Sequence, residues 1–447
     1  MEKVTRLAAT KPIVLSHCLT FVGLLPNSLA ETTNWRQIAK ISLLFILSFI
    51  ALAFEIMAKI AKLIELPNGD VQVFDVVQYS QYWVKTVVVI MIFVLVVRKS
   101  RTMLRLMEQL DSFMDEHSEQ GKSDRWWWPL SNQTTITASV TVAFSLYVLT
   151  MTATRVRTVI RHYEDGGPAV PFLGWEMHKA LSEVIMLVGR NYTEPIRVMC
   201  AGYLGILLCR FAEGLAVKCE NVFAKIASGS RITLTSEDVQ EAWNAREMAL
   251  TMSELISDNL GSLLSAIIIS DVLCLNSSFA NFLFPCTIYT VFDQIRNGVQ
   301  IVVYITSLLS ITTGLIRLHD IDDRTWNIVK KLQSGNTHCL MFARNSGLGT
   351  GKVLQTWRSF KAAQGCEIAE EVDLVLPLYI LDSSCFGHRK VAPVIAFFGH
   401  VTRGTIISAF GLLLTFFCFM MDQLGRSQNR GAATATLSLN SSQSLWD

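Results

Sequence analysis

The stretch Gly404–Gln423 reads GTIISAFGLLLTFFCFMMDQ, and it decides the fold class of this chain. It is about 20 residues of nearly unbroken apolar sequence, which is the length an α-helix needs to cross a bilayer. The stretch ends in Asp422 and Gln423, at the depth where hydrocarbon gives way to water. Because a carboxylate on a lipid-facing helix is costly, we expect Asp422 to face a water-filled path or a protein interior.

Several copies of this helix around one axis would bring their Asp422 side chains into a ring that attracts cations and repels anions. Phe416, Phe419 and Met420 share one face of the helix and could gate such a pore by dewetting. Packing of these aromatics against neighbouring helices is the alternative, and for Asp422 the alternative to a pore position is exposure in the outer headgroup layer. The predicted pore and gate residues are Thr415, Phe416, Phe419, Met420, Asp422 and Gln423.

The composition is typical of a membrane protein. Hydrophobic residues make up 51% of the 447 residues and charged residues 17%, whereas soluble domains carry about 25% charge. The net charge of +2 is too small to indicate nucleic acid as a partner. Cys385 and His388 have the spacing of metal ligands but lack a second pair. Since no dinucleotide fingerprint, nucleophile elbow or HExxH pair occurs, we expect a protein that is not an enzyme and binds no cofactor or metal.

Seven apolar runs predict an all-α polytopic membrane protein with seven transmembrane helices. Pro285 breaks the sequence between the fifth and sixth runs and favours a tight hairpin there. The fourth run is less uniform than the others because Arg197 and Arg210 lie within it. The runs are Ile41–Ile60, Tyr82–Val97, Ile136–Ala153, Ile196–Val217, Leu260–Phe284, Ile288–Ile316 and Val394–Met421.

The distribution of lysine and arginine predicts a cytosolic N-terminus. With that orientation, the segments on the cytosolic side carry far more of these residues than the segments outside, as the positive-inside rule requires. The glycosylation sequons at Asn191 and Asn440 then fall outside, where glycans are added, whereas the sequon at Asn132 falls inside. We therefore expect a glycoprotein that crosses the cell membrane several times.

The cytosolic parts continue the membrane helices. Thr235 and Asp238 have the spacing of a capping box, and they open a helix over Val239–Ile256 that runs into the fifth span. The fourth span continues without a strong breaker through residues 211–226, so we expect the two helices to project into a cytosolic anchor region over about residues 211–258. Two ordinary amphipathic loop helices are the alternative.

The remaining domains follow from these boundaries. The third cytosolic loop, 317–393, contains a helical segment Asp323–Leu332 and a linker Ser334–Gly351 rich in Gly, Asn and Ser. Ile13–Leu25 is an amphipathic stretch within the N-terminal segment. The predicted domains are a cytosolic segment 1–40, six spans with their extensions 41–316, the loop 317–393, a last helix 394–424 with a cytosolic part and a pore-lining part, and a disordered extracellular tail 425–447.

The outer half of the helix bundle is the expected place for a ligand pocket, since such sites are concave and carry a few polar groups. Aromatic and hydrogen-bonding side chains there suit a sugar or another small polar molecule, although each alone could serve packing or interfacial anchoring. Asp271 is the sharpest candidate because a buried carboxylate needs a partner. The candidates are Tyr82, Trp83, Tyr147, Asp271, Asn276, Tyr289, Asp293 and Gln294.

The closing sequence FFGHVTRGTIISAFGLLLTF, which ends at Phe416, resembles the closing segment of invertebrate gustatory receptors, the insect-type seven-transmembrane chemoreceptor channels. In that family an Arg precedes the last span, which closes on Thr-Tyr, five apolar residues and Gln-Phe. Here Thr415-Phe416 and Asp422-Gln423 occupy the Thr-Tyr and Gln-Phe positions, so the chain resembles a divergent member. Leu250–Phe284 also looks like the equivalent segment of the family.

The resemblance implies a chemosensory receptor that acts as a ligand-gated, non-selective cation channel of four identical or related subunits. It also implies a central anchor made by the cytosolic ends of the fourth to seventh helices and a pore lined by the outer part of the seventh. A small-molecule tastant is the implied ligand. Two alternatives stay open: a seven-span receptor signalling through cytosolic partners, and a transporter or intramembrane enzyme.

Overall fold

The computed structural model describes residues 13–26, 35–64, 73–115, 133–164, 169–172, 175–220, 236–283, 291–345, 391–396 and 398–405. In the last helix it further describes residues 407–409, 411–412, 414–415, 418–419 and 422. Nearly all of these residues are helical, and the described strands form two short antiparallel hairpins. The all-α fold class predicted from the sequence is therefore confirmed.

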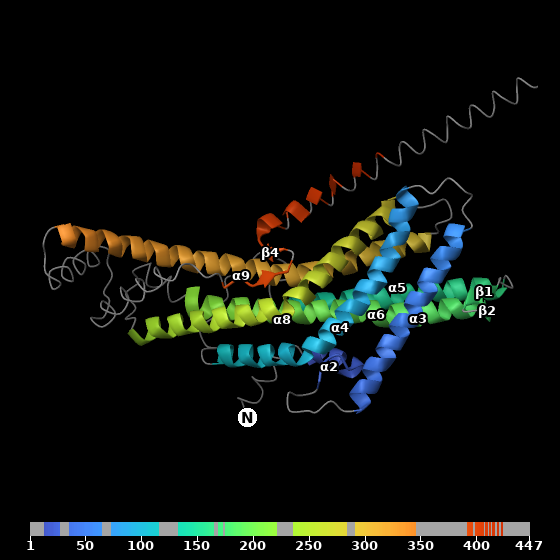
Figure 1. Cartoon of the computed structure of the whole chain (residues 1–447), viewed down its shortest axis with the longest axis horizontal. Coiled ribbons are helices and arrows are strands. Elements are labelled where there is room, and N and C mark those ends of the chain that lie inside the picture. Colours follow the sequence, from blue (N-terminus) through green and yellow to red (C-terminus); the bar gives the residue numbers. More distant parts are fainter. Residues whose placement is uncertain are drawn as a thin grey trace, which may run out of the picture.

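Six of the predicted apolar runs lie on long helices (Figure 1). Among the described residues, four stretches are long and apolar enough to cross a membrane: Gln133–Arg161, Glu194–Cys219, Asn244–Phe279 and Gln294–Asn327. The elements are α2 (Ile13–Val22), α3 (Trp35–Ile64), α4 (Val73–Asp115), α5 (Gln133–Glu164), β1 (Ala169–Phe172), β2 (Trp175–His178), α6 (Lys179–Leu215), the π-helix η1 (Ala216–Glu220), α8 (Ser236–Leu283), α9 (Val291–Asn345), β3 (Val394–Ile395) and β4 (Gly399–His400).

Helix α6 is the centre of the bundle. It contacts α2, α3, α4, α5, α8 and α9, and its side chains from Glu194 to Ala212 are all buried. Small residues allow the closest of these contacts, as is common between membrane helices. A Cβ added at Gly314 of α9 would lie 2.6 Å from Cβ of Leu208, and one at Gly205 of α6 would strike the carbonyl oxygen of Ser310. The α6–α9 crossing therefore depends on glycine from both helices.

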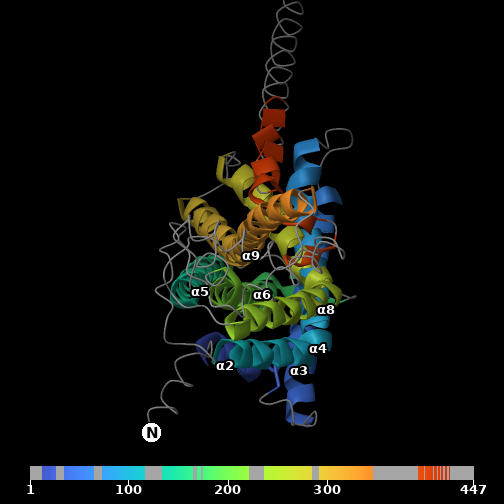
Figure 2. The same ribbon diagram turned by 90° about the vertical axis from the view of Figure 1, so that its left-hand side faces the viewer.

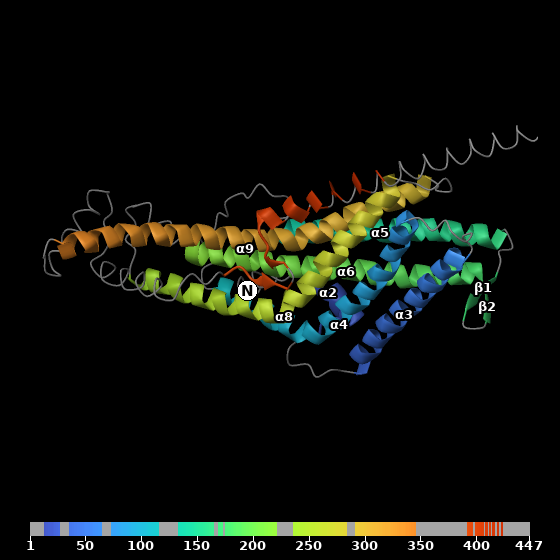
Figure 3. The same cartoon turned by 45° about the horizontal axis from the view of Figure 1, so that its top comes forward.

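Helices α8 and α9 are each continuous and extend side by side beyond most of the bundle (Figures 1 and 3). The predicted continuity of Val239–Ile256 with the fifth span is confirmed, because α8 covers both. The predicted linker Ser334–Gly351 is wrong as far as Asn345, since α9 runs unbroken to that residue. No proline interrupts this part of α9, and a single Gly335 costs a helix only about 1 kcal/mol.

The predicted last span, Val394–Met421, is not helical at its start. Residues 394–395 pair with residues 399–400 in the β3–β4 hairpin, in which Gly399 adopts φ +65°, and the described residues from 403 to 422 are helical. A reciprocal cap starts the helix: the Thr402 and Thr405 hydroxyls each accept the other residue's backbone N–H, both at 3.2 Å. This capping box fixes the helix start, nine residues later than the beginning of the apolar run.

Several predicted features lie outside the described residues. These are the turn at Pro285, the remainder of the predicted extension 221–226, the cap at Thr235, most of the loop 317–393 and the tail 425–447. At the other end of the chain, α2 covers most of the predicted stretch Ile13–Leu25 and packs on α6.

Candidate functional site

A buried ion pair joins two helices in the apolar bundle. Arg197 of α6 and Asp271 of α8 are both fully buried, and the Arg197 Nη1 donates to Oδ1 of Asp271. The second carboxylate oxygen accepts the hydroxyl of Ser307 on α9 at 2.6 Å. Three helices therefore meet at one carboxylate. Since each of its oxygens has a partner, the charge that membrane burial would otherwise penalise is compensated.

The surroundings of this pair are polar and aromatic. Oε2 of Glu194, one helical turn before Arg197, lies 3.4 Å from its Nε, and the guanidinium carbon lies 5.1 Å from the ring centroid of Tyr304 on α9. Tyr147 of α5 and Tyr304 are both buried. The Nη2 atom of Arg197 is buried with no hydrogen-bond partner among the described residues. The cluster thus combines charge, ring faces and an uncommitted donor.

Among the predicted ligand residues, Asp271 lies in this cluster and Tyr147 of α5 is buried. Asn276 is half-buried on α8, and Gln294 is exposed near the start of α9. The other four give no such information: Tyr82, Trp83 and Asp293 lie on α4 and α9 with side chains outside the described set, and Tyr289 lies outside the described residues. As a set, the eight therefore remain a prediction.

Sequence reasoning missed Arg197, Glu194, Tyr304 and Ser307 as members of this cluster. From the sequence, Arg197 was noted only as a charged residue that makes the fourth apolar run less uniform. A signal existed, since a basic residue in one span and an acidic residue in another can satisfy each other's burial. Arg210 of α6 follows the same rule, with Nη1 at 2.6 Å from Oδ1 of Asp111 on α4.

The last helix makes few contacts with its own subunit. Beyond Thr405 none of its described side chains is buried. Figures 1 and 2 show this segment, in red, running away from the other helices. Among the predicted pore residues, Phe419 is 47% exposed, Asp422 is exposed, and the Thr415 hydroxyl donates to the Gly411 carbonyl at 2.9 Å. Phe416, Met420 and Gln423 lie outside the described residues.

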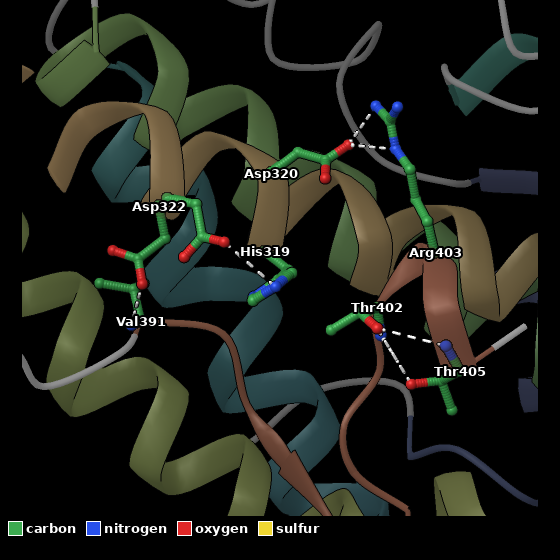
Figure 4. A network of polar contacts seen from close by, with 8 residues as sticks. His319, Asp320, Asp322, Val391, Thr402, Arg403 and Thr405 are labelled. Carbon is green, nitrogen blue, oxygen red and sulfur yellow. Dashed lines mark hydrogen bonds and ion pairs between the residues drawn. The ribbon is translucent and has the colours of Figure 1, made fainter. Parts of the chain in front are cut away.

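A network of polar contacts fastens the segment before the last helix to α9 (Figure 4). Oδ2 of Asp322 accepts the backbone N–H of Val391 at 2.8 Å, and its Oδ1 lies 3.4 Å from Nη2 of Arg246 on α8. Asp320 accepts both Nε and Nη2 of Arg403, at 3.1 and 2.6 Å. His400 of β4 stacks on His319 of α9 with ring centroids 6.5 Å apart.

The two predicted glycosylation sites remain predictions. Asn191 lies on α6 with its side chain outside the described set, and Asn440 lies outside the described residues. Within the described part of the chain, no group of three or more His, Cys, Asp or Glu side chains could hold a metal ion.

Comparisons with known proteins find a shared fold at very low sequence identity. No protein-family model and no curated protein matches this chain. The structure of the insect olfactory receptor OR5 from Machilis hrabei in complex with eugenol matches with a TM-score of 0.56 and 10% identity, over 92% of this chain and 99% of that one. A second structure of OR5 from Machilis hrabei matches with a TM-score of 0.41 and 9% identity, over 92% of this chain and 98% of that one. The chain is thus a membrane protein with the fold of an insect olfactory receptor, as its resemblance to gustatory receptors implied.

Proposed function

We propose that this chain is a subunit of a ligand-gated, non-selective cation channel that responds to a small-molecule tastant. The subunit crosses the cell membrane seven times with its N-terminus in the cytosol. Four identical or related subunits surround the pore, and the last helix of each lines it. Asp422 faces the permeating ions, and the face carrying Phe416, Phe419 and Met420 gates the path.

One observation carries this proposal: the last helix is apolar all round, yet its own subunit does not bury it. Ile407, Leu412 and Leu414 are 71%, 69% and 64% exposed. A helix with this pattern is stable only inside a larger protein assembly or in lipid. Lipid alone does not suit a helix that ends in Asp422, whereas copies gathered around a water-filled axis suit both its apolar and its acidic parts.

The polar cluster around Arg197 and Asp271 supports a ligand site in the same bundle. It joins α6, α8 and α9, next to the aromatic ring of Tyr304. An uncommitted Arg197 Nη2 donor suits a hydroxyl or carbonyl oxygen of a small polar ligand. The olfactory receptor OR5 was solved with eugenol, a small molecule with oxygen acceptors, which agrees with this class of ligand.

Current recorded from cells that express this chain alone tests the channel. Reversal potentials under a sodium chloride gradient give the preference for cations over anions, for basal current and for current evoked by a panel of sugars and other small polar compounds. We expect cation preference in the wild type and a clear loss in Asp422→Ala. Asp258→Ala is the matched control, because Asp258 is an exposed acid on α8 far along the chain from the last helix.

Two results would count against the proposal. An unchanged cation preference in Asp422→Ala would show that a ring of Asp422 carboxylates does not select the permeating ions. A response that develops slowly and disappears in excised patches without nucleotide would indicate a receptor that acts through cytosolic partners, whereas a channel opens within milliseconds in such patches.

A further inference from the structure

The last helix is held at its base by two sets of contacts that differ in burial. The first set fixes the junction, which we define as residues 391–402. The second set consists of the single ion pair between Arg403, the first residue of the helix, and Asp320 of α9. Most of the junction contacts are buried, although the hydrogen bond between Ser257 and Val394 is exposed, whereas the Arg403 side chain of the ion pair is 59% exposed.

The junction packs against α8 and α9. Val391, Ile395 and Val401 are buried. Asp322, itself 1% exposed, accepts the N–H of Val391 and faces Arg246, so its charge is compensated in place. These contacts remove water from charged and polar groups, and separating them would leave those groups unpaired.

Helix α8 makes three further contacts with the backbone of the junction. The hydroxyl of Ser257 accepts the N–H of Val394 at 2.9 Å, and the hydroxyl of Ser265 donates to the carbonyl of Ala396. Between these two serines, a Cβ at Gly261 would lie 3.2 Å from the carbonyl oxygen of Val394. The β3–β4 hairpin therefore lies directly against the α8 backbone and moves with it.

The Arg403–Asp320 ion pair, in contrast, is accessible to solvent. Its side chains are 59% and 20% exposed, and both guanidinium nitrogens reach the same carboxylate oxygen. An exposed pair of this sort contributes little and exchanges readily with water. It joins α9 to the first turn of the last helix (Figure 4), next to Gly404, which carries no side chain to hinder a change of direction.

We infer that Arg403 and Asp320 are positioning residues that hold the base of the last helix in the closed arrangement. This inference rests on the proposed channel function. When the channel opens, the pair separates and the last helix swings about Gly404, while the buried junction stays on α8 and α9. A contact of modest strength suits this role, because ligand binding shifts the equilibrium only by its difference in affinity for the two states.

Paired recordings and hydrogen–deuterium exchange test this role. We compare wild type with Asp320→Asn, Arg403→Gln, Arg403→Lys and the swap Asp320→Arg with Arg403→Asp. Glu213→Gln is the matched control, because Glu213 is a 28% exposed carboxylate of α6 that pairs with Arg317 of α9 at 3.2 Å. Surface expression and elution as an intact assembly are checked for each variant, and the exposed pair is not expected to affect either.

We expect Asp320→Asn and Arg403→Gln to raise the ligand-free current by up to about fivefold for each pair lost. The amides of residues 402–405 should exchange faster in the same two variants. The swap should restore both readouts, Arg403→Lys should restore them in part, and Glu213→Gln should change neither.

Unchanged exchange at residues 402–405 in Asp320→Asn would overturn the inference, because the pair would then not hold the helix. Faster exchange with unchanged ligand-free current in a conducting protein would also overturn it, because the pair would be structural only. If neither the wild type nor any variant conducts, the proposed channel function fails. In that case exchange alone decides, and faster exchange reversed by the swap supports the holding role.

Discussion

Helix α6 and the last helix are both long and apolar, but their surroundings are opposite. Between Glu194 and Ala212 of α6 every side chain is buried by other helices of the same subunit. Between Thr405 and Asp422 no described side chain is buried. The chain therefore completes the surroundings of α6 by itself, whereas those of the last helix must come from outside the chain.

Charged residues follow the same division. The buried charge of α6, Arg197, has its partner Asp271 within the subunit. The acid of the last helix, Asp422, lies at the exposed end of a helix that leaves the bundle. The charge of α6 lies inside the bundle, whereas that of the last helix lies at an exposed position. Hydropathy alone does not distinguish these two kinds of helix, but the burial of their charged side chains does.

The largest effect should come from breaking the buried pair. Asp271→Leu leaves Arg197 buried with Glu194, 3.4 Å from its Nε, as its remaining carboxylate, which should lower the free energy of unfolding by up to about 3–5 kcal/mol. Thermal melting followed by size-exclusion chromatography measures it. Adding Arg197→Met should recover much of the loss, because the uncompensated charge is gone. A double variant no more stable than Asp271→Leu would show that the pair is not what limits stability here.

A smaller effect should come from the glycines of the two helices. Gly205→Ala places a Cβ against the Ser310 carbonyl and should cost about 1–3 kcal/mol by overpacking. Gly411→Ala is its counterpart on the last helix, where an added Cβ meets nothing within 4 Å. The same melting experiment should show a loss for Gly205→Ala and none for Gly411→Ala. Equal losses would contradict the difference in packing.

The smallest effect on the subunit should come from Leu412→Asn. Leu412 is 69% exposed, so its replacement should leave melting of the bundle nearly unchanged, within about 0.5 kcal/mol. Light scattering of the purified protein should instead show fewer intact assemblies, because the last helix meets its neighbours there. A large drop in melting temperature with unchanged assembly would contradict the account of the last helix.

The sequence predicted the helical fold well because its main signal is the length of apolar runs. Hydrocarbon thickness sets that length directly, so α3, α4, α5, α6, α8 and α9 were each anticipated. The continuity of α8 followed from the absence of a breaker between residue 239 and the fifth span. The same argument, applied to residues 317–345, would have corrected the predicted linker, since no proline interrupts α9 there.

The local details were harder to predict because they depend on distant partners. Asp271 was singled out correctly as a carboxylate in need of a partner, but which helix would supply Arg197 depends on the packing order. The β3–β4 hairpin was missed because Val394, Ile395 and Ala396 are as apolar as a helix start. Their hairpin depends on Ser257 and Ser265 of α8, more than 130 residues away.

An image of the assembled protein tests the central claim most directly. Single-particle electron microscopy of the full chain in lipid nanodiscs would locate the last helix relative to any symmetry axis. We predict four subunits around one axis, with residues 403–422 of each bordering a shared aqueous path and Asp422 facing it. A structure with that helix against lipid, away from any axis shared by the subunits, would contradict the account.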